Sequence, residues 1–323
     1  MSRYIIKRIL WMIPVILLVA FTIFTILYFV PGDPTALLLG NGATQAQKEA
    51  LREQLGLNDS YLVRLGRFFK ETFLEFDLGT SYQYKTSVSK ELMTWLSITF
   101  QLTLLTFLFE ALIGIPMGVT AAVHQNTIVD RVCTVISVIG ASLPNFWLAL
   151  MLVIVFSVNL NVLPSHGVTT WTGWILPVAA GCVMDMGGIA RQTRSQMLEV
   201  INSDFITTAR SKGLPENTIR YRHALPNAIL PVVTTLGTRF GRALGGTVVI
   251  ETVFSIPGVG TYLNDAISAR DYPVICGSVV VLSILLCVIV LLTDLAYALI
   301  DPRIKAEYEK SGKRKRKVKE ADA

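Results

Sequence analysis

The sequence is short of charge, cysteine and histidine, and these shortages exclude several classes of protein. Charged residues make up only 16% of its 323 residues, against about 25% in an ordinary soluble domain. Apolar residues make up 52%, and the mean hydropathy is +0.53. Because so few polar groups are available to cover a folded surface, the composition excludes an ordinary soluble domain and indicates an integral membrane protein.

The few cysteines and histidines form no pattern that is typical of a metal site. The cysteines lie in or beside apolar segments, at Cys133, Cys182, Cys276 and Cys287. The histidines are widely separated, at His124, His166 and His223. We therefore interpret the cysteines as reduced packing residues and expect no metal site.

Motifs for nucleotide binding and hydrolysis are missing as well. The pattern G-x-x-x-x-G-K-[ST], whose backbone amides hold phosphate groups, does not occur, and the only Gly-Lys pair, Gly312–Lys313, is followed by Arg314. There is no nucleophile elbow either. We predict no catalytic residue, no cofactor and no enzymatic activity in this chain.

Long apolar segments, by contrast, fill most of the sequence. Those that reach the roughly 20 residues needed to cross a bilayer are 9–30, 95–123, 132–160, 173–191, 228–250 and 275–299. The first is too long for a signal peptide and ends at Pro31-Gly32-Asp33-Pro34 instead of a small-residue cleavage site, so we expect it to be retained. The predicted fold class is all-α, an integral membrane bundle of six transmembrane helices.

The distribution of Lys and Arg predicts how this bundle is oriented. Most basic residues outside the spans lie at the N-terminus, in the loops 124–131 and 191–227, and in the C-terminal tail. Positive charge in short segments favours the cytoplasmic side, whereas the loop 31–94 is long enough to cross regardless of its charge. We therefore expect both termini and the 191–227 loop to be cytoplasmic.

The long loop 31–94 is predicted to form a small helical subdomain outside the membrane. Thr44 and Gln47 have the spacing of a capping box, and Gly56 is placed to end the helix that they begin. A second helix is predicted over 61–76, where apolar residues at intervals of three and four indicate one buried face: Leu62, Leu65, Phe69, Phe73 and Phe76. The subdomain is either a docking surface for a substrate-delivering protein or a cap over the bundle.

The stretch 204–231 is a polar interruption between two spans and is predicted to form helix, turn and helix. Asp204 is a suitable N-cap, Gly213 a suitable left-handed C-cap, and Pro215 the start of a second short helix that runs to Leu225. The residues on one face of the first helix are Phe205, Ile206 and Ala209, and the basic residues of the hairpin are Arg210, Lys212, Arg220 and Arg222. The hairpin is either a docking element for a soluble partner or a solvated basic loop.

This stretch resembles the coupling loop of the permease subunits of binding-protein-dependent ABC importers. That loop has a Glu-Ala-Ala, Gly, Leu-Pro pattern, which this chain matches at Ala209, Gly213, Leu225 and Pro226, with Thr207 and Thr208 in place of Glu and Ala. Further matching motifs are PGDP (31–34), QLGL (54–57), ETVFSIPGVG (251–260), RDYPV (270–274) and DPR (301–303). Within the family, the chain resembles the dipeptide, oligopeptide and nickel branch through Asp204, Thr208–Leu214 and Arg222–Leu225.

The resemblance implies how the chain is organised. The domains are 1–30, the cytoplasmic N-terminus and first span; 31–94, the external helical subdomain; 95–302, a permease core of five spans with the cytoplasmic coupling loop 196–227; and 303–323, a basic cytoplasmic tail. The residues expected to couple the chain to an ATPase are Asp204, Phe205, Thr208, Ala209, Arg210, Lys212, Gly213, Leu214, Leu225 and Pro226.

The resemblance also implies partners and cargo. The partners are a second homologous permease, two ATP-binding subunits that hold ATP and Mg²⁺, and an extracytoplasmic binding protein, in a bacterial-type cell membrane. The cargo is short peptides, with nickel chelates or glutathione-like compounds as the alternative. An ion-coupled secondary transporter is a more remote alternative, because such proteins pair broken spans with repeated intramembrane acids. The basic tail is expected to lie on anionic membrane lipid and not on nucleic acid.

The fifth span combines a glycine stripe with two arginines. Gly237, Gly241 and Gly245 recur every four residues, which allows close approach of another helix, either in the same subunit or in a second permease. Arg239 and Arg242 point away from this stripe. An arginine that faces lipid near the bilayer centre costs at least about 2.5 kcal/mol, so both are expected to face water or a carboxylate.

Three acidic residues in other spans are available to these arginines: Glu110, Asp185 and Asp294. One hypothesis is that Arg239, Arg242, Glu110 and Asp185 line the translocation path and contact the cargo; the other is a buried ion pair. After this span, Pro257, Gly258 and Gly260 break regular helix. The turn that contains them, with 270–274, is either a gate at the outer mouth or an ordinary loop.

Overall fold

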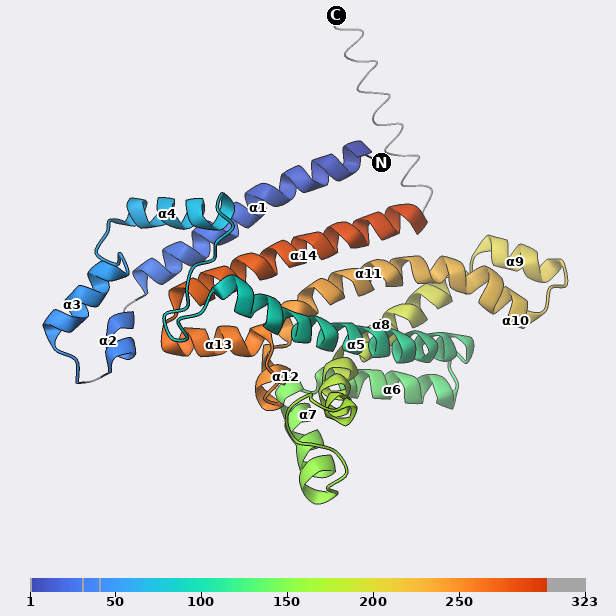
Figure 1. The fold of residues 1–323 in the computed structure, drawn as a ribbon. Coiled ribbons are helices and arrows are strands. Elements are labelled where there is room, and N and C mark those ends of the chain that lie inside the picture. The colour runs from blue at the N-terminus through green and yellow to red at the C-terminus, as the bar shows by residue number, and fades with distance from the viewer. Residues whose placement is uncertain (1, 31, 41, 301–323) are drawn as a thin grey trace, which may run out of the picture.

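The computed structural model describes residues 2–30, 32–40 and 42–300, without the side chains of a few residues in these ranges, Arg242 among them. Within this part of the chain, the regular elements are helices (Figure 1), apart from an isolated bridge between Thr80 and Ser87. The basic tail 303–323 and the DPR motif at 301–303 lie outside the described residues.

Four helices are long and apolar enough to cross a membrane, or five if one bent pair counts as a single span. They are α1 (Ser2–Phe29), α5 (Val88–Val123), α8 (Ile175–Ile201) with the 3₁₀ turn Trp171–Trp174 before it, and α14 (Tyr272–Ile300). The described residues therefore give an all-α membrane fold with four or five such spans, where the sequence predicts six.

The bent pair replaces the span predicted over 132–160. Helix α6 (Ile128–Ser142) is followed by α7 (Asn145–Leu152) and a π-helical segment (Val153–Asn159), with an angle of 101° between the two halves. Pro144 has no N–H and disfavours helical geometry at the preceding residue, and Leu143 is extended, with φ −79° and ψ 128°. The predicted span is therefore not one continuous helix, and α7 extends away from the bundle (Figure 1).

The span predicted over 228–250 corresponds to α11 (Leu225–Gly246) and the start of α12 (Val248–Val253). Helix α11 is not among the four counted above; besides its apolar residues it carries Arg239, Arg242 and several threonines. It nevertheless packs inside the bundle, against α5, α8 and α14.

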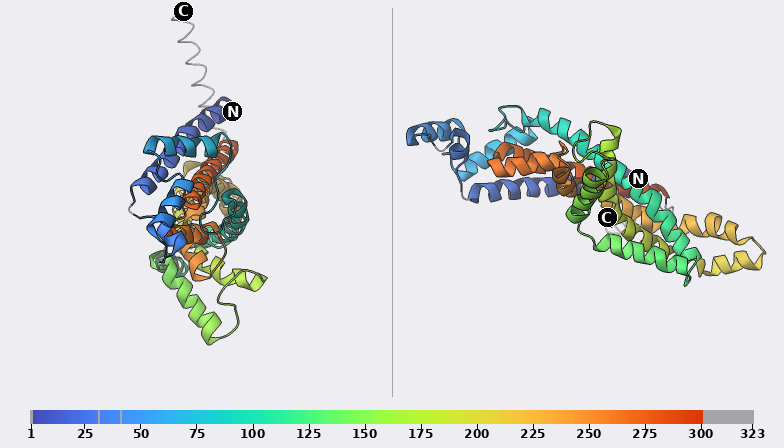
Figure 2. Two further views of the ribbon diagram at one scale, coloured as in Figure 1. Left: turned by 60° about the vertical axis from the view of Figure 1, so that its left-hand side comes forward. Right: turned by 90° about the horizontal axis from the view of Figure 1, so that it is seen from below.

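Helix α8 lies at the centre of the molecule, in contact with α5, α6, α7 and α11, while α1 packs against α14 at the side. The molecule is elongated, with the 34–73 helices at one end and α9 (Asp204–Ser211) and α10 (Glu216–Thr218) at the other (Figures 1 and 2). The start of α1 and the end of α14 point toward the α9 end (Figure 1). Two regions far apart in sequence thus occupy opposite ends of one bundle.

The predicted external subdomain consists of α2 (Pro34–Leu39), α3 (Gln45–Gln54) and α4 (Tyr61–Phe73). The capping box of Thr44 and Gln47 is confirmed, because both reciprocal bonds are present. Gly56 has φ +62° directly after the C-cap of α3, so its predicted role in ending that helix is also confirmed.

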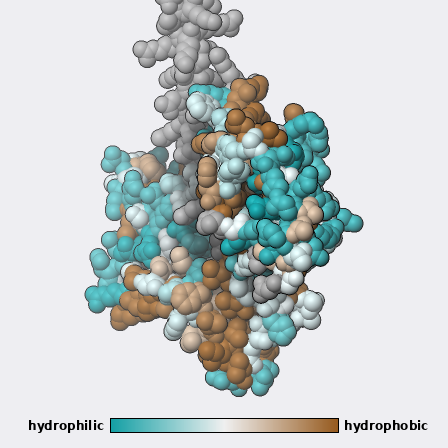
Figure 3. All heavy atoms as spheres, turned by 90° about the vertical axis from the view of Figure 1, so that its left-hand side faces the viewer, coloured by the Kyte–Doolittle hydropathy of each residue, from teal (hydrophilic) through white to brown (hydrophobic). Residues whose placement is uncertain are grey.

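The prediction of one buried apolar face on 61–76 is wrong: Leu65, Phe69 and Phe73 are only half-buried, and the other two residues of the predicted face are exposed. Leu62 is 75% exposed and Phe76 is 82% exposed. Helix α4 instead turns Phe68 toward the bundle, where its ring stacks on Phe24 of α1 at 5.2 Å. Viewed from this end, much of the surface is hydrophilic, and hydrophobic residues gather at its upper and lower edges (Figure 3).

Candidate functional site

The predicted hairpin is present as α9, α10 and a π-helical turn (Ile219–Ala224) that runs directly into α11. The N-cap of α9 is Ser203, in extended geometry, and not Asp204, which is the first helical residue. The N-cap prediction was therefore wrong by one residue. Asp204 still lies in the first turn of α9, where its negative charge interacts favourably with the positive end of the helix dipole.

The turn after α9 is a Schellman motif. Gly213 has φ +76°, and its N–H donates to the carbonyl of Arg210 at 2.9 Å. The N–H of Leu214 donates to the carbonyl of Ala209 at 3.4 Å. The predicted left-handed conformation of Gly213 is confirmed, and only glycine adopts it without strain.

One side chain anchors α9 to the bundle. Ile206 is fully buried in a cluster with Val119 of α5, Met197 of α8 and Ile219 of the π-helical turn. Phe205, predicted on the same face, is 49% exposed, because it lies one residue, about 100°, around the helix. The hairpin is thus held by the ends of α5 and α8 and presents Phe205 to the outside.

The charges of the hairpin are partly paired with one another. Glu216 accepts from Arg210 at 2.8 Å and lies 3.6 Å from Arg220. The hydrogen bond from Arg210 lowers the pKa of Glu216. Lys212 is exposed, and Thr208 is exposed with its hydroxyl donating to a backbone carbonyl. Leu225 and Pro226 open α11 without a break, so the hairpin and α11 form one continuous piece.

Three of the residues proposed for the translocation path meet inside the bundle. Arg239 of α11 lies 2.5 Å from Asp185 of α8 and 3.8 Å from Glu110 of α5. Glu110 is buried, while the Asp185 side chain is 39% exposed, so the cluster reaches the surface of this subunit. The side chain of Arg242 lies outside the description, and Asp294 pairs with Arg8 of α1.

The glycine stripe divides into a packed part and an open part. A Cβ added at Gly237 would lie 2.0 Å from the Thr293 side chain of α14, and one at Gly241 would lie 2.8 Å from Leu286. Nothing lies within 4 Å of the corresponding position at Gly245. Two of the three glycines therefore pack within the subunit.

Two polar contacts were missed by the sequence reasoning. Glu251, at the start of the ETVFSIPGVG motif, is fully buried and accepts from Thr99 at 2.8 Å, Thr247 at 2.9 Å and the N–H of Thr261 at 3.1 Å. The signal that could have found it is an acid in an otherwise apolar stretch, shortly before Pro257-Gly258. A Cβ added at Gly258 would lie 2.3 Å from the Glu251 carboxyl carbon, so the motif's glycine makes room for the carboxylate.

The second missed contact joins α6 to α8 near the hairpin. Arg194 donates to both carboxylate oxygens of Asp130, at 2.6 and 2.8 Å, and Asp130 is buried. Arg194 falls in the predicted cytoplasmic loop 191–227, where a basic residue needs no partner, but in the structure it lies in α8. Among the described residues, no group of His, Cys, Asp and Glu side chains is arranged to hold a metal ion.

Known proteins resemble this chain along its whole length. The family model described as the binding-protein-dependent transport system inner membrane component matches residues 114–306, and the corresponding N-terminal model matches residues 1–103. The dipeptide transport system permease protein DppB of Alkalihalophilus pseudofirmus is 37% identical over 333 residues, covering 94% of this chain and 100% of that protein.

Two further relatives are permease proteins of oligopeptide and glutathione transport systems. The oligopeptide transport system permease protein AppB of Bacillus subtilis is 39% identical over 316 residues, covering 94% of this chain and 100% of the relative. The glutathione transport system permease protein GsiC of Salmonella paratyphi A is 38% identical over 305 residues, covering 94% and 99%.

Among solved structures, the inward-facing MetNI methionine ABC transporter has a chain with a TM-score of 0.57 at 21% identity, covering 65% of this chain and 96% of that one. This likeness shows the permease fold. The family models cover both halves of the sequence, and the resemblance noted in its motifs is confirmed. The chain therefore belongs to the family of binding-protein-dependent transport system inner membrane components and is a permease subunit of an ABC importer, not an enzyme.

Proposed function

We propose that this permease imports short peptides and forms half of the translocation path with a second, homologous permease. Two ATP-binding subunits dock at the pair of permeases, one of them at the α9 hairpin of this chain, and an extracytoplasmic binding protein delivers cargo at the α2–α4 end. Both termini are cytoplasmic, and α11 together with the bent α6–α7 pair completes six membrane spans. The peptide cargo is supported by the relatives, whose names specify dipeptide, oligopeptide and glutathione, the last itself a tripeptide.

The observation that carries this proposal is the geometry of the α9 hairpin. It is a capped helix at one end of the molecule, anchored through Ile206 to α5 and α8 and continuous with α11. Its exposed face includes Phe205. A force applied to α9 by a closing ATPase pair is therefore passed to three helices of the bundle core, which is how rigid-body rocking switches access.

Docking is tested by co-purification of the assembled transporter in mild detergent. In Phe205→Asp, the charge at the exposed apolar position should reduce recovery of the ATP-binding subunit that docks on this chain at least tenfold. The matched control is Phe76→Asp, which alters an exposed phenylalanine at the opposite end of the molecule. The double change Ala209→Glu, Gly213→Pro should remove the ATP-binding subunit that this chain holds. If none accompanies the wild type, or if both Phe variants behave alike, docking at α9 is disproved.

We propose that the cluster of Arg239, Asp185 and Glu110 lines the path. It joins helices α5, α8 and α11 of the bundle core, and the exposed part of Asp185 leaves it partly open at the surface of this subunit. Arg239→Gln removes the positive charge that would meet a peptide carboxylate or carbonyl, so peptide uptake should fall at least tenfold while the ATP-binding subunits still co-purify. Unchanged uptake in this variant would leave the cluster with a structural role alone.

A further inference from the structure

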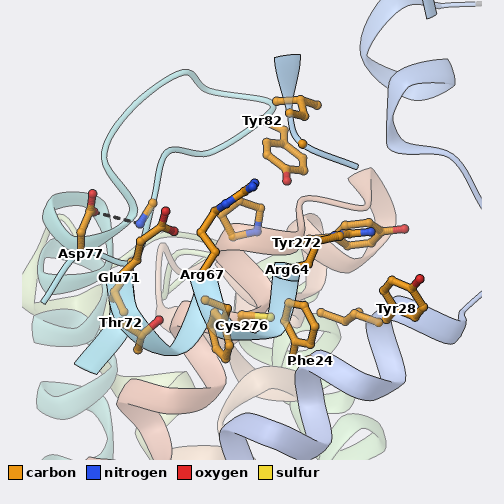
Figure 4. Close-up of a pocket in the computed structure, with 17 residues that line it drawn as sticks. Phe24, Tyr28, Arg64, Arg67, Glu71, Thr72, Asp77, Tyr82, Tyr272 and Cys276 are labelled. Atoms are coloured by element: carbon orange, nitrogen blue, oxygen red, sulfur yellow. Dashed lines mark hydrogen bonds between the residues drawn. The ribbon is translucent and has the colours of Figure 1, made fainter. Parts of the chain in front are cut away.

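A cavity of about 150 Å³ lies at the α2–α4 end, away from the charge cluster and the hairpin (Figure 4). It is open on one side. Helix α4 forms one wall, the end of α1 and the start of α14 form another, and the loop after α4 closes it from above. Arg64, Arg67 and Glu71 rise from α4, and Tyr82 faces them from the loop (Figure 4).

The cavity lies where the spans end. Tyr28 is next to the last residue of α1, and Tyr272 is the first residue of α14. Tyrosines at span ends are typical of the level of the lipid headgroups. Beside the cavity, α4 exposes Leu62 at 75% and Val63 at 52%, directly before the basic residues Arg64, Arg67 and Lys70 of the same helix. Exposed apolar and basic residues on a short helix at this level are typical of a helix that lies in the membrane interface, in contact with lipid.

Three charged side chains that line the cavity, Arg64, Glu71 and Asp77, form no ion pair with any described residue. Arg64 is half-buried, lies 5.2 Å over the ring of Tyr28 and contacts the carbonyl of Leu57 at 3.5 Å. No carboxylate lies within 4.0 Å of it, and no basic group lies within 4.0 Å of Glu71. Because they are seven residues apart, Arg64 and Glu71 lie on one face of α4, two turns from each other.

Two other polar groups of the cavity already have a partner, and a third is a donor. Arg67 pairs with Asp59, and Asp77 accepts from the N–H of Gly79 at 2.9 Å. Burial raises the pKa of Tyr82 to about 12, so its phenol stays protonated and can donate to an anion. Apolar side chains of α1 and α4, Phe24, Leu27 and Phe68, form the remaining surface.

We propose that this cavity binds the headgroup of an aminophospholipid from the leaflet on the side opposite the α9 hairpin. The phosphate lies against Arg64 and the hydroxyl of Tyr82, and the primary ammonium lies against Glu71. The glycerol and upper acyl chain lie on the apolar surface beside α1. A lipid fits better than a soluble zwitterion because the cavity lies at the side of the bundle, on the span that packs outside the core, next to exposed apolar residues of α4.

Native mass spectrometry of the purified full chain tests this proposal. The chain is stripped of lipid and then given equal amounts of phosphatidylethanolamine, phosphatidylcholine and phosphatidylglycerol with identical acyl chains. Phosphatidylethanolamine should be retained about tenfold over the other two, because choline cannot donate to Glu71 and the glycerol headgroup carries no ammonium. This comparison needs no variant. Equal retention of all three lipids would overturn the proposal.

Single-residue variants then test the separate roles proposed for Arg64 and Glu71. Arg64→Gln should lower retention of all phospholipids, while Glu71→Gln should remove only the preference for phosphatidylethanolamine. The matched controls are Lys70→Gln and Glu75→Gln, which alter an exposed ion pair on the same helix and just after it, outside the cavity. Loss of binding in these controls equal to that in Arg64→Gln would show non-specific surface attraction and contradict the site.

Soluble competitors separate a lipid from other zwitterions. Phosphoethanolamine and dialanine, each in large excess, should leave the phosphatidylethanolamine adduct in place, because neither contacts the apolar wall. Displacement by phosphoethanolamine would identify a site for a soluble phosphate compound, and displacement by dialanine a site for cargo; either result overturns the lipid assignment.

Discussion

At the scale of single residues, Glu251 organises the turn that follows α11 and α12. Its carboxylate accepts from side chains of α5 and of the residue between α11 and α12, and from the backbone of α13 (Val259–Ala269). Thr99 also accepts from the N–H of Val259 at 2.8 Å. Three separate elements are therefore joined through one buried carboxylate and one hydroxyl, with no water-exposed side to substitute for a lost partner.

We predict that Glu251→Leu destabilises the protein by at least about 3 kcal/mol, because several buried donors lose their acceptor at about 1–3 kcal/mol each. Glu251→Gln keeps one acceptor oxygen, so its stability should lie between that of Glu251→Leu and that of the wild type. The measurement is the apparent melting temperature of the detergent-purified chain. The control is Asp265→Asn, an exposed acid on neighbouring α13 that should melt with the wild type. A Glu251→Leu variant that also melts with the wild type would show that the network is dispensable.

At the scale of elements, the contact between α11 and α14 depends on small residues at particular positions. Gly237 faces Thr293, Gly241 faces Leu286 and Ile289, and Gly245 faces open space. Gly237 and Gly241 lie in the interior of α11, and Gly245 lies in its last turn. Helix propensity favours alanine over glycine, so a loss of stability on substitution at Gly237 reports packing against α14.

We predict that Gly237→Ala lowers the apparent melting temperature, because the new methyl group would lie 2.0 Å from Thr293 and force α11 and α14 apart. Gly245→Ala, with nothing within 4 Å, should be neutral or stabilising by up to about 1 kcal/mol. Adding Thr293→Ala to Gly237→Ala should restore part of the loss. The packing explanation fails if the two alanine variants have the same effect.

At the scale of the whole molecule, the proposed cargo-delivery and ATPase ends are opposite ends of one bundle (Figure 2). Helices α5, α8, α11 and α14 run between them. This arrangement is what an importer requires, since delivery and energy input have to occur on different sides of the membrane.

We predict that single cysteines introduced at the two ends label from opposite sides. Ala46→Cys in α3 should react with a membrane-impermeant maleimide in right-side-out vesicles, and Ser211→Cys in α9 only in inverted vesicles. The wild type, whose described cysteines are buried or half-buried, gives the background. Labelling of both positions from the same side would refute the assigned orientation.

Much of the fold followed from the sequence because its signals are local. Hydropathy located the long helices, the Thr44 and Gln47 pair located the start of α3, and Gly213 located the end of α9, since each depends on a few consecutive residues. Locality also explains the misplaced N-cap, because Ser203 and Asp204 are both good caps and only backbone geometry separates them.

The tertiary structure decided which residues meet, because those contacts join segments far apart in the chain. The sequence contains three acidic residues that could pair with Arg239. In the structure Arg239 lies beside Asp185 and Glu110, whereas Asp294 pairs with Arg8. Packing also gave Gly237 and Gly245 different surroundings, although the sequence pattern is the same, and it left the side chain of Leu62 exposed. The cavity beside α4 exists only where three distant segments converge, so no local pattern could have revealed it.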